Sequence, residues 1–123
     1  MKNRLPVTII IPIRNEAAYI ERCLSSILAQ DYPGEIEIQV VDGMSIDGTR
    51  QKVQQFTIQP STLNIKLLDN PGKIVPIGMN IALRQAKGDI IIRVDGHCII
   101  APDYVSNCVR HIQTDGVDGA GGP

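Results

Sequence analysis

The sequence predicts an α/β fold in which a mostly parallel sheet lies between two helical layers, a three-layer sandwich. Short apolar runs alternate along the chain with segments of helical periodicity. The run at residues 7–11 is continuous and β-branched, as in a strand buried on both faces of a parallel sheet, and residues 90–94 are expected to be another buried strand. Strands joined by helices in this way form right-handed parallel crossovers. With 123 residues, we expect a single domain over residues 1–123.

The first half of the chain is predicted to contain two strand–helix units. After the strand at residues 7–11, apolar side chains recur at helical spacing over residues 17–28, and Asn15 is the expected N-cap of that helix. Residues 36–41 form the second expected strand, which ends at an Asp-Gly turn. The next helix is expected to start near Asp47.

The second half repeats this alternation. A third strand is expected at residues 63–68, followed by a helix over residues 75–86 with Gly88 as its C-cap. After the strand at residues 90–94, Pro102 opens the last helix, and a short strand is expected from Val117. The glycine-rich end cannot complete a fold, so we expect the domain to be truncated there.

Composition excludes several functional classes. Lysine and arginine number 12 against 13 acidic residues, and only 3% of residues are aromatic, so neither a nucleic acid nor an anionic membrane surface is an expected partner. Three cysteines are an odd number and fit reduced thiols in a cytoplasmic protein. No apolar run approaches the ~20 residues of a membrane helix. No dinucleotide glycine motif, P-loop or nucleophile elbow is present.

Polar clusters follow three of the expected strands, at residues 12–16, 42–49 and 95–97. Ligands of open parallel sheets bind at the carboxyl ends of the strands, so we expect these clusters to share one rim. Asp42 can accept hydrogen bonds from a base or ribose. The alternative is that Asp-Gly is turn chemistry and that Ser45 and Asp47 are helix caps.

Asp95 and His97 are the candidate metal ligands, because a carboxylate and an imidazole two residues apart suit Mn²⁺ or Mg²⁺ on a diphosphate. The alternative is an Asp-Gly turn beside a histidine that caps or packs. Lys73, in a glycine-bearing loop, and Arg14 can neutralise phosphate charge, although most lone lysines are simply solvated.

A zinc site formed by histidines and cysteines is a weaker hypothesis than the Asp95 and His97 metal site. It would need His97, Cys98, Cys108 and His111 to converge tetrahedrally. His97 and Cys98 are adjacent on an expected extended segment and so should point in opposite directions, and Cys108 lies on an apolar helix stripe. This arrangement disfavours zinc.

Together, residues 7–16, 40–49 and 88–97 resemble the inverting family 2 glycosyltransferases of the GT-A fold, with its Rossmann-like nucleotide-binding half. The Arg-Val-Asp-Gly-His segment at residues 93–97 looks closest to the exopolysaccharide glucosyltransferases of the succinoglycan type. The resemblance spans essentially the whole chain. It implies that Pro12, Arg14 and Glu16 line the nucleotide pocket and that Asp42 binds the base, with Ser45 beside it.

The resemblance also implies a divalent metal, Mn²⁺ or Mg²⁺. Asp95 takes the first position of the family's Asp-x-Asp motif, while His97 stands where most members have Asp, which leaves the metal's identity open. The family's catalytic base lies well beyond this motif. We therefore assign no catalytic residue in a chain that stops at Pro123.

The implied function is inverting transfer of a sugar from a nucleotide-diphosphate sugar, with UDP as the expected nucleotide, to a saccharide or lipid-linked acceptor. Such enzymes often work at the cytoplasmic face of a membrane. Two alternatives remain: a non-catalytic nucleotide-binding or assembly module, and a sugar-nucleotide nucleotidyltransferase. The latter should have a glycine in the loop at residues 13–16, which this chain lacks. The sequence leaves homo-oligomerisation open.

Overall fold

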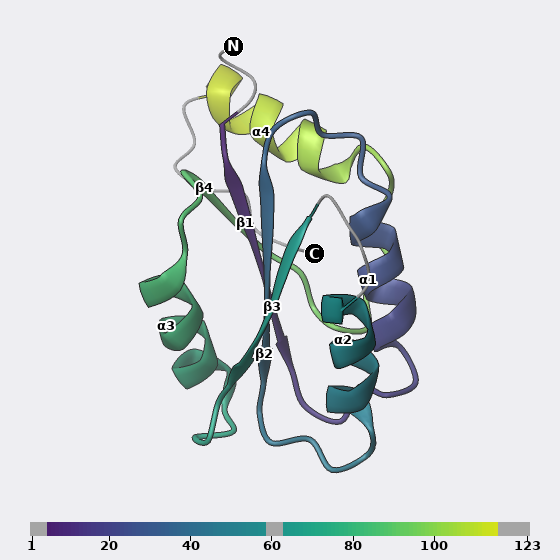
Figure 1. The fold of residues 1–123 in the computed structure, drawn as a ribbon. Helices are drawn as coiled ribbons and strands as arrows, with labels where there is room; N and C mark the ends of the chain where they lie inside the picture. Colours follow the sequence, from purple (N-terminus) through teal and green to yellow (C-terminus); the bar gives the residue numbers. More distant parts are fainter. Residues whose placement is uncertain (1–4, 59–62, 116–123) are drawn as a thin grey trace.

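A computed structural model describes residues 5–58 and 63–115 and shows a four-stranded sheet in the order β3-β2-β1-β4. All strand pairs are parallel (Figure 1). In chain order the elements are β1 (Val7–Ile13), α1 (Ile20–Leu28), β2 (Ile36–Asp42), α2 (Thr49–Ile58), β3 (Asn64–Asp69), α3 (Val75–Gln85), β4 (Ile90–Arg93) and α4 (Tyr104–Asp115).

Helices cover both faces of the sheet, which confirms the expected α/β sandwich. Figure 1 shows α3 on one face and α1, α2 and α4 on the other. Alternation along β1 divides its side chains between two cores, because successive residues of a strand face opposite ways. Ile9 and Ile11 pack with α1 and α4, whereas Ile10 packs with Ala82 of α3.

The register brings the carboxyl ends of the strands to one edge, which we call the carboxyl edge. Ile13 pairs with Asp42, and Asp42 pairs with Asp69. β4 is shorter, and its last residue, Arg93, pairs with Ile10. The segments that follow the strands therefore leave the sheet side by side, as the sequence predicts.

The first strand is longer than expected and includes Pro12, which a central strand would normally exclude because proline has no N–H to donate. Pro12 pairs with Val41 of β2 on one side. On its other side the ladder with β4 has already ended, opposite Ile10. Proline is accommodated because only one neighbour remains at this position.

Two expected helix caps are wrong. α1 begins at Ile20 after Tyr19, without a side-chain cap, and Asn15 instead adopts a left-handed conformation with φ 54°. α3 ends at Gln85, before Gly88. Gly88 is required for close packing: a Cβ there would lie 2.5 Å from the backbone nitrogen of Thr8.

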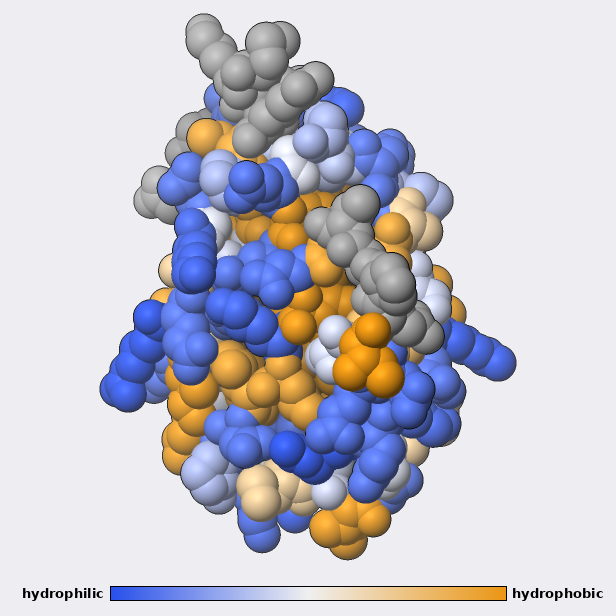
Figure 2. Space-filling view, viewed as in Figure 1, coloured by the Kyte–Doolittle hydropathy of each residue, from blue (hydrophilic) through white to orange (hydrophobic). Residues whose placement is uncertain are grey.

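The surface shows apolar side chains along the middle of the face that β3 fronts, flanked by hydrophilic side chains (Figure 2). Within the described residues, no helix is long and apolar enough to cross a membrane. The strand expected from Val117 lies outside the described residues.

Candidate nucleotide-sugar site

A cleft of about 360 Å³ opens at the carboxyl edge of the sheet. It brings together residues from the end of β1, the loop between β3 and α3, and the segment around the end of β4. Its lining contains Pro12, Ile13, Arg14, Glu16, Val41, Asn70, Lys73, Val75, Arg93, Asp95, Gly96 and His97. Most of the site residues expected from the sequence are thus in one cleft, and Asp42 and Ser45 are not among the residues that line it.

Asp95 lies on the wall of the cleft and is held by an arginine that the sequence analysis missed. The Nε and Nη2 atoms of Arg93 donate to Asp95 Oδ1 at 3.2 and 3.1 Å. Both side chains remain partly exposed, at 45% and 31%. The two residues are separated by one position, so an extended chain places them on the same face, and this spacing could have identified Arg93.

Just after β4 the chain turns tightly, and this turn corrects the expected orientation of Cys98. The backbone N–H of Cys98 donates to the carbonyl of Asp95 at 3.0 Å. Ligand atoms of Asp95, His97 and Cys98 all lie within 4.8 Å of one another. The expectation that His97 and Cys98 point apart is wrong, because it assumed an extended chain where the structure has a turn.

Gly96 allows this turn to pack against β1. It is buried, and a Cβ at this position would lie 2.5 Å from Ile13 Cγ2. With a larger residue at position 96, either the Ile13 side chain or the turn that carries Asp95 and His97 would have to move.

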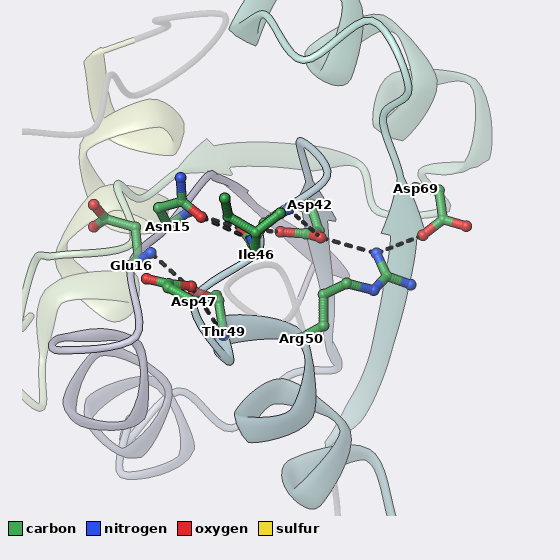
Figure 3. A network of polar contacts seen from close by, with 9 residues as sticks. Asn15, Glu16, Asp42, Ile46, Asp47, Thr49, Arg50 and Asp69 are labelled. Atoms are coloured by element: carbon green, nitrogen blue, oxygen red, sulfur yellow. Dashed lines mark hydrogen bonds and ion pairs between the residues drawn. The ribbon is translucent and has the colours of Figure 1, made fainter.

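Glu16 faces the same turn. Its Oε2 atom lies 3.6 Å from Nδ1 of His97, is itself buried and has no hydrogen-bond partner. Figure 3 shows that the Glu16 carboxylate points away from Asp47 and Thr49, although its backbone is held there. A histidine whose one nitrogen faces a carboxylate is the arrangement that orients imidazole toward a metal.

Asp42 is fully buried beside the cleft. Its Oδ1 accepts from the Ser45 hydroxyl at 2.5 Å, and its Oδ2 accepts from Arg50 Nη1 at 2.9 Å and from the Ser45 N–H at 3.2 Å. Arg50 Nη1 also pairs with Asp69 Oδ1 at 2.7 Å (Figure 3). These bonds, to Asp42 first, raise the pKa of the Arg50 guanidinium. The contact between Asp42 and a base stays a prediction.

The loop after β2 is hydrogen-bonded to the loop after β1. The Asn15 N–H donates to Ser45 Oγ at 2.8 Å, and Asn15 Oδ1 accepts from the Ile46 N–H at 2.9 Å. Thr49 Oγ1 accepts from the Glu16 N–H at 2.9 Å and donates to Asp47. That last bond is the main reason why the pKa of Asp47 is lowered.

Asp47 bonds Thr49 at the start of α2, as expected of a cap, whereas Ser45 bonds Asp42 and Asn15 and does not cap that helix. These contacts fix the conformation of the segment that carries Arg14 and Glu16 into the cleft.

Lys73 and Asn70 form the third side of the cleft. Lys73 has a left-handed φ of 68°, and its N–H donates to the Asn70 carbonyl at 3.0 Å. Asn70 is 4% exposed, its Nδ2 donates to the Ile74 carbonyl at 2.9 Å, and its Oδ1 is buried without a partner. Asn70 was not expected in the site, because an asparagine before Pro-Gly is typical of a turn.

A larger hollow of about 650 Å³ lies at the opposite edge, which we call the amino edge, and includes Pro6, Glu37 and Lys87. The Oε1 atom of Glu37 already accepts from Thr8, Gln39 and the Lys87 N–H. Because ligands of parallel sheets bind at the carboxyl ends of the strands, we place the site in the smaller cleft.

Comparison with known proteins gives the family. The model of glycosyl transferase family 2 matches residues 8–123. Among curated relatives, glycosyltransferase AglE of Haloferax volcanii is 35% identical over 99% of this chain and 40% of its own length. Succinoglycan biosynthesis protein ExoA of Rhizobium meliloti is 30% identical over 89% of this chain and 33% of its own.

Solved structures agree. Mannosyltransferase PcManGT of Pyrobaculum calidifontis, determined with GDP-Man and Mn²⁺, superposes with a TM-score of 0.83 and 34% identity, over 89% of this chain and 32% of that one. TarS of Staphylococcus aureus (residues 1–349), in complex with UDP-GlcNAc, gives a TM-score of 0.76 and 30% identity, over 89% of this chain and 31% of that one.

The expected GT-A fold and family resemblance are thereby confirmed, and a succinoglycan biosynthesis protein is among the relatives. The chain spans 40% or less of the length of these curated relatives. Over nearly its whole length, this chain belongs to glycosyl transferase family 2.

Proposed function

We propose that this domain binds the nucleotide-diphosphate sugar donor of a glycosyltransferase in the carboxyl-edge cleft, together with a divalent metal. The observation that carries the proposal is that cationic residues and potential metal ligands line the same cleft. Three cationic side chains, from Arg14, Lys73 and Arg93, face the same space as Asp95 and His97. A diphosphate is bound by cationic side chains that neutralise its charge and by a metal ion, so a cleft that offers both cations and metal ligands suits it.

The residues present fit a divalent cation. Asp95 supplies a carboxylate oxygen and His97 a ring nitrogen within 4.8 Å of each other, and Glu16 faces the His97 ring. We therefore assign Asp95 and His97 to the metal. When bound, the metal supplies positive charge that stabilises the departing diphosphate.

The chain's own residues bind and orient the donor. Arg14, in the loop after β1, and Lys73, in the loop between β3 and α3, both line the cleft and neutralise the charge of the diphosphate. Pro12 and Glu16 line the same cleft, and we assign both to the nucleotide pocket. Asp42 and Ser45 hold the loops that form this pocket, and a direct contact between Asp42 and the base requires Ser45 to release its bond.

For the whole protein we propose inverting transfer to a saccharide or lipid-linked acceptor. An inverting transfer needs a base within hydrogen-bond reach of the acceptor hydroxyl, and no residue described here is assigned to that role. The reading as a non-catalytic module is not favoured, since the matched relatives include named glycosyltransferases. Mn²⁺ and Mg²⁺, and UDP and GDP, remain to be distinguished by binding.

Isothermal titration of the 123-residue chain with UDP and with GDP, each with Mn²⁺ and with Mg²⁺, tests the proposal. We expect metal-dependent binding of one nucleotide, and a loss of at least about tenfold in Asp95→Ala, as for removal of a metal ligand or its supporting group. Asp89→Ala is the matched control, since Asp89 is an exposed carboxylate just before β4, at the opposite end of that strand. Absence of binding by the wild type, or equal affinities in both variants, contradicts the proposal.

A further inference from the structure

We propose that Cys98 is a third ligand of the metal site and that its thiolate makes the site prefer thiophilic divalent cations such as Zn²⁺, Co²⁺ and Cd²⁺ over Mg²⁺. This inference rests on the proposed function, because it concerns the metal that would accompany the nucleotide. It goes further by assigning a ligand and a metal preference to this chain.

The turn after β4 places the three ligand atoms together. The Cys98 N–H bonds the Asp95 carbonyl at 3.0 Å, which reverses the chain so that Cys98 and Asp95 face the same point. The carboxylate, the imidazole and the thiol are within 4.8 Å of one another. Separations of this size need only small side-chain movements to close on one ion, whose bonds to these atoms are about 2.0–2.3 Å.

A second, independent observation comes from β1 and the loop after it. Glu16 Oε2 is buried, has no hydrogen-bond partner and lies 3.6 Å from His97 Nδ1. A buried carboxylate oxygen without a donor is costly unless a partner arrives. An imidazole that donates Nδ1–H to Glu16 satisfies this oxygen and leaves the Nε2 lone pair for a metal.

The other cysteines are poorer candidates. Burial raises the pKa of the Cys23 thiol to about 12, with Cys98 nearby as a further cause. Burial also raises the pKa of the Cys108 thiol on α4. Metal binding requires the thiolate, so these environments keep Cys23 and Cys108 protonated.

A donor set of carboxylate, imidazole and thiolate has a defined preference. Mg²⁺ binds oxygen ligands and disfavours sulfur, whereas Zn²⁺ and Co²⁺ accept all three types. On binding, Cys98 loses its S–H proton to solvent as the metal–sulfur bond forms, with no change in oxidation state. An Asp in place of His97, as in most of the family, would give a harder site; the histidine and Cys98 together soften it.

Titration with Co²⁺ tests the proposal, because a cobalt–thiolate bond gives an intense near-ultraviolet charge-transfer band. We expect the band in the wild type and in Cys108→Ser, and its loss in Cys98→Ser. Zn²⁺ affinity should fall at least about tenfold in Cys98→Ser and in Glu16→Gln, the size typical of perturbed metal sites. Circular dichroism confirms that each variant is folded.

A wild type without the band, or a band that persists in Cys98→Ser, overturns the inference. If that happens while the wild type binds nucleotide with Mg²⁺, the proposed function stands and only the role of Cys98 fails. If the band behaves as expected but no nucleotide binds with any metal, the thiolate site stands and the proposed function fails.

Discussion

Glu37 at the amino edge and Glu16 at the carboxyl edge differ in how their carboxylate oxygens are hydrogen-bonded, whereas Asp42, also at the carboxyl edge, is fully bonded. At the amino edge, Glu37 is 9% exposed, and its Oε1 atom accepts from Thr8 Oγ1 at 2.9 Å and from Gln39 Nε2 and the Lys87 N–H at 3.1 Å. At the carboxyl edge, Glu16 has a buried oxygen without a donor. A saturated carboxylate indicates architecture, whereas an unsatisfied one indicates a site that awaits a partner.

Two of the three unsatisfied buried side-chain oxygens of the described residues lie at the carboxyl edge. Among the described residues, the buried side-chain oxygens without a partner belong to Glu16, Gln39 and Asn70. Glu16 and Asn70 line the carboxyl-edge cleft, and Gln39 lies within β2. The larger hollow therefore lies beside Glu37, whose Oε1 atom is fully hydrogen-bonded. The smaller cleft is lined by Glu16 and Asn70, which each have a buried oxygen without a hydrogen-bond donor.

The largest expected effect is at Gly88, in the amino-edge network. Its N–H donates to Thr8 Oγ1 at 2.9 Å, and a Cβ there would lie 2.5 Å from the Thr8 nitrogen. Because the obstacle is backbone, Gly88→Ala should lower the free energy of unfolding by about 3 kcal/mol, the upper end for overpacking. Urea denaturation measures it. A loss below that of Gly34→Ala, where the obstacle is the Tyr32 ring, would contradict this account.

Glu37 gives the next effect. Glu37→Ala leaves three donors without their acceptor and should cost about 2–3 kcal/mol in urea denaturation. Glu37→Gln keeps a carbonyl oxygen in the position of Oε1, so it should cost under about 1 kcal/mol. Equal losses in the two variants would show that the charge, and not the acceptor, matters. Nucleotide affinity should be unchanged in Glu37→Gln.

Substitution of Arg93 should change the affinities for metal and for nucleotide in opposite directions. Arg93→Gln removes a cation that competes for Asp95, so affinity for metal alone should rise by at most about fivefold, the equivalent of one exposed ion pair. The same change removes a diphosphate contact, so nucleotide affinity should fall. Calorimetry with metal alone and then with UDP or GDP measures both. A fall in the affinity for metal alone, or no change in it, would refute the competition.

The smallest effect concerns Asp47 and pH. The Thr49 hydroxyl lowers the Asp47 pKa below its ordinary value of 3.8, so its contribution to stability is present above that value and is lost as pH falls below it. Between about pH 5 and pH 3, the wild type should therefore lose more stability than Asp47→Asn. Urea midpoints at the two pH values measure this difference; a steeper loss in Asp47→Asn would reverse the sign we assign.

The layers of the fold and the grouping of polar residues at the carboxyl edge could be predicted from the sequence. Continuous β-branched runs specify strands buried on both faces, and parallel strands bring Arg14 and Asp95 to one edge. These inferences depend on periodicity and topology, which single residues seldom override.

The predictions that were wrong or missing depended on local backbone geometry or on contacts between distant segments. Asn15 was expected as a cap, yet its side chain bonds the Ile46 N–H in a loop distant in sequence. Cys98 was expected to point away from His97, but a backbone hydrogen bond turns the chain. No sequence pattern identified Arg50 as a partner of Asp42 and Asp69, because these two aspartates come together only through the pairing of β2 with β3.

Nuclear magnetic resonance with Mn²⁺ and nucleotide tests most directly the claim that the carboxyl edge is the binding site. The unpaired electrons of Mn²⁺ broaden amide signals near the ion. We predict that the signals of Gly96 and His97 disappear first, while those of Glu37 and Lys87 persist. Broadening that starts at Glu37 and Lys87, or that is equal at both edges, would contradict the account.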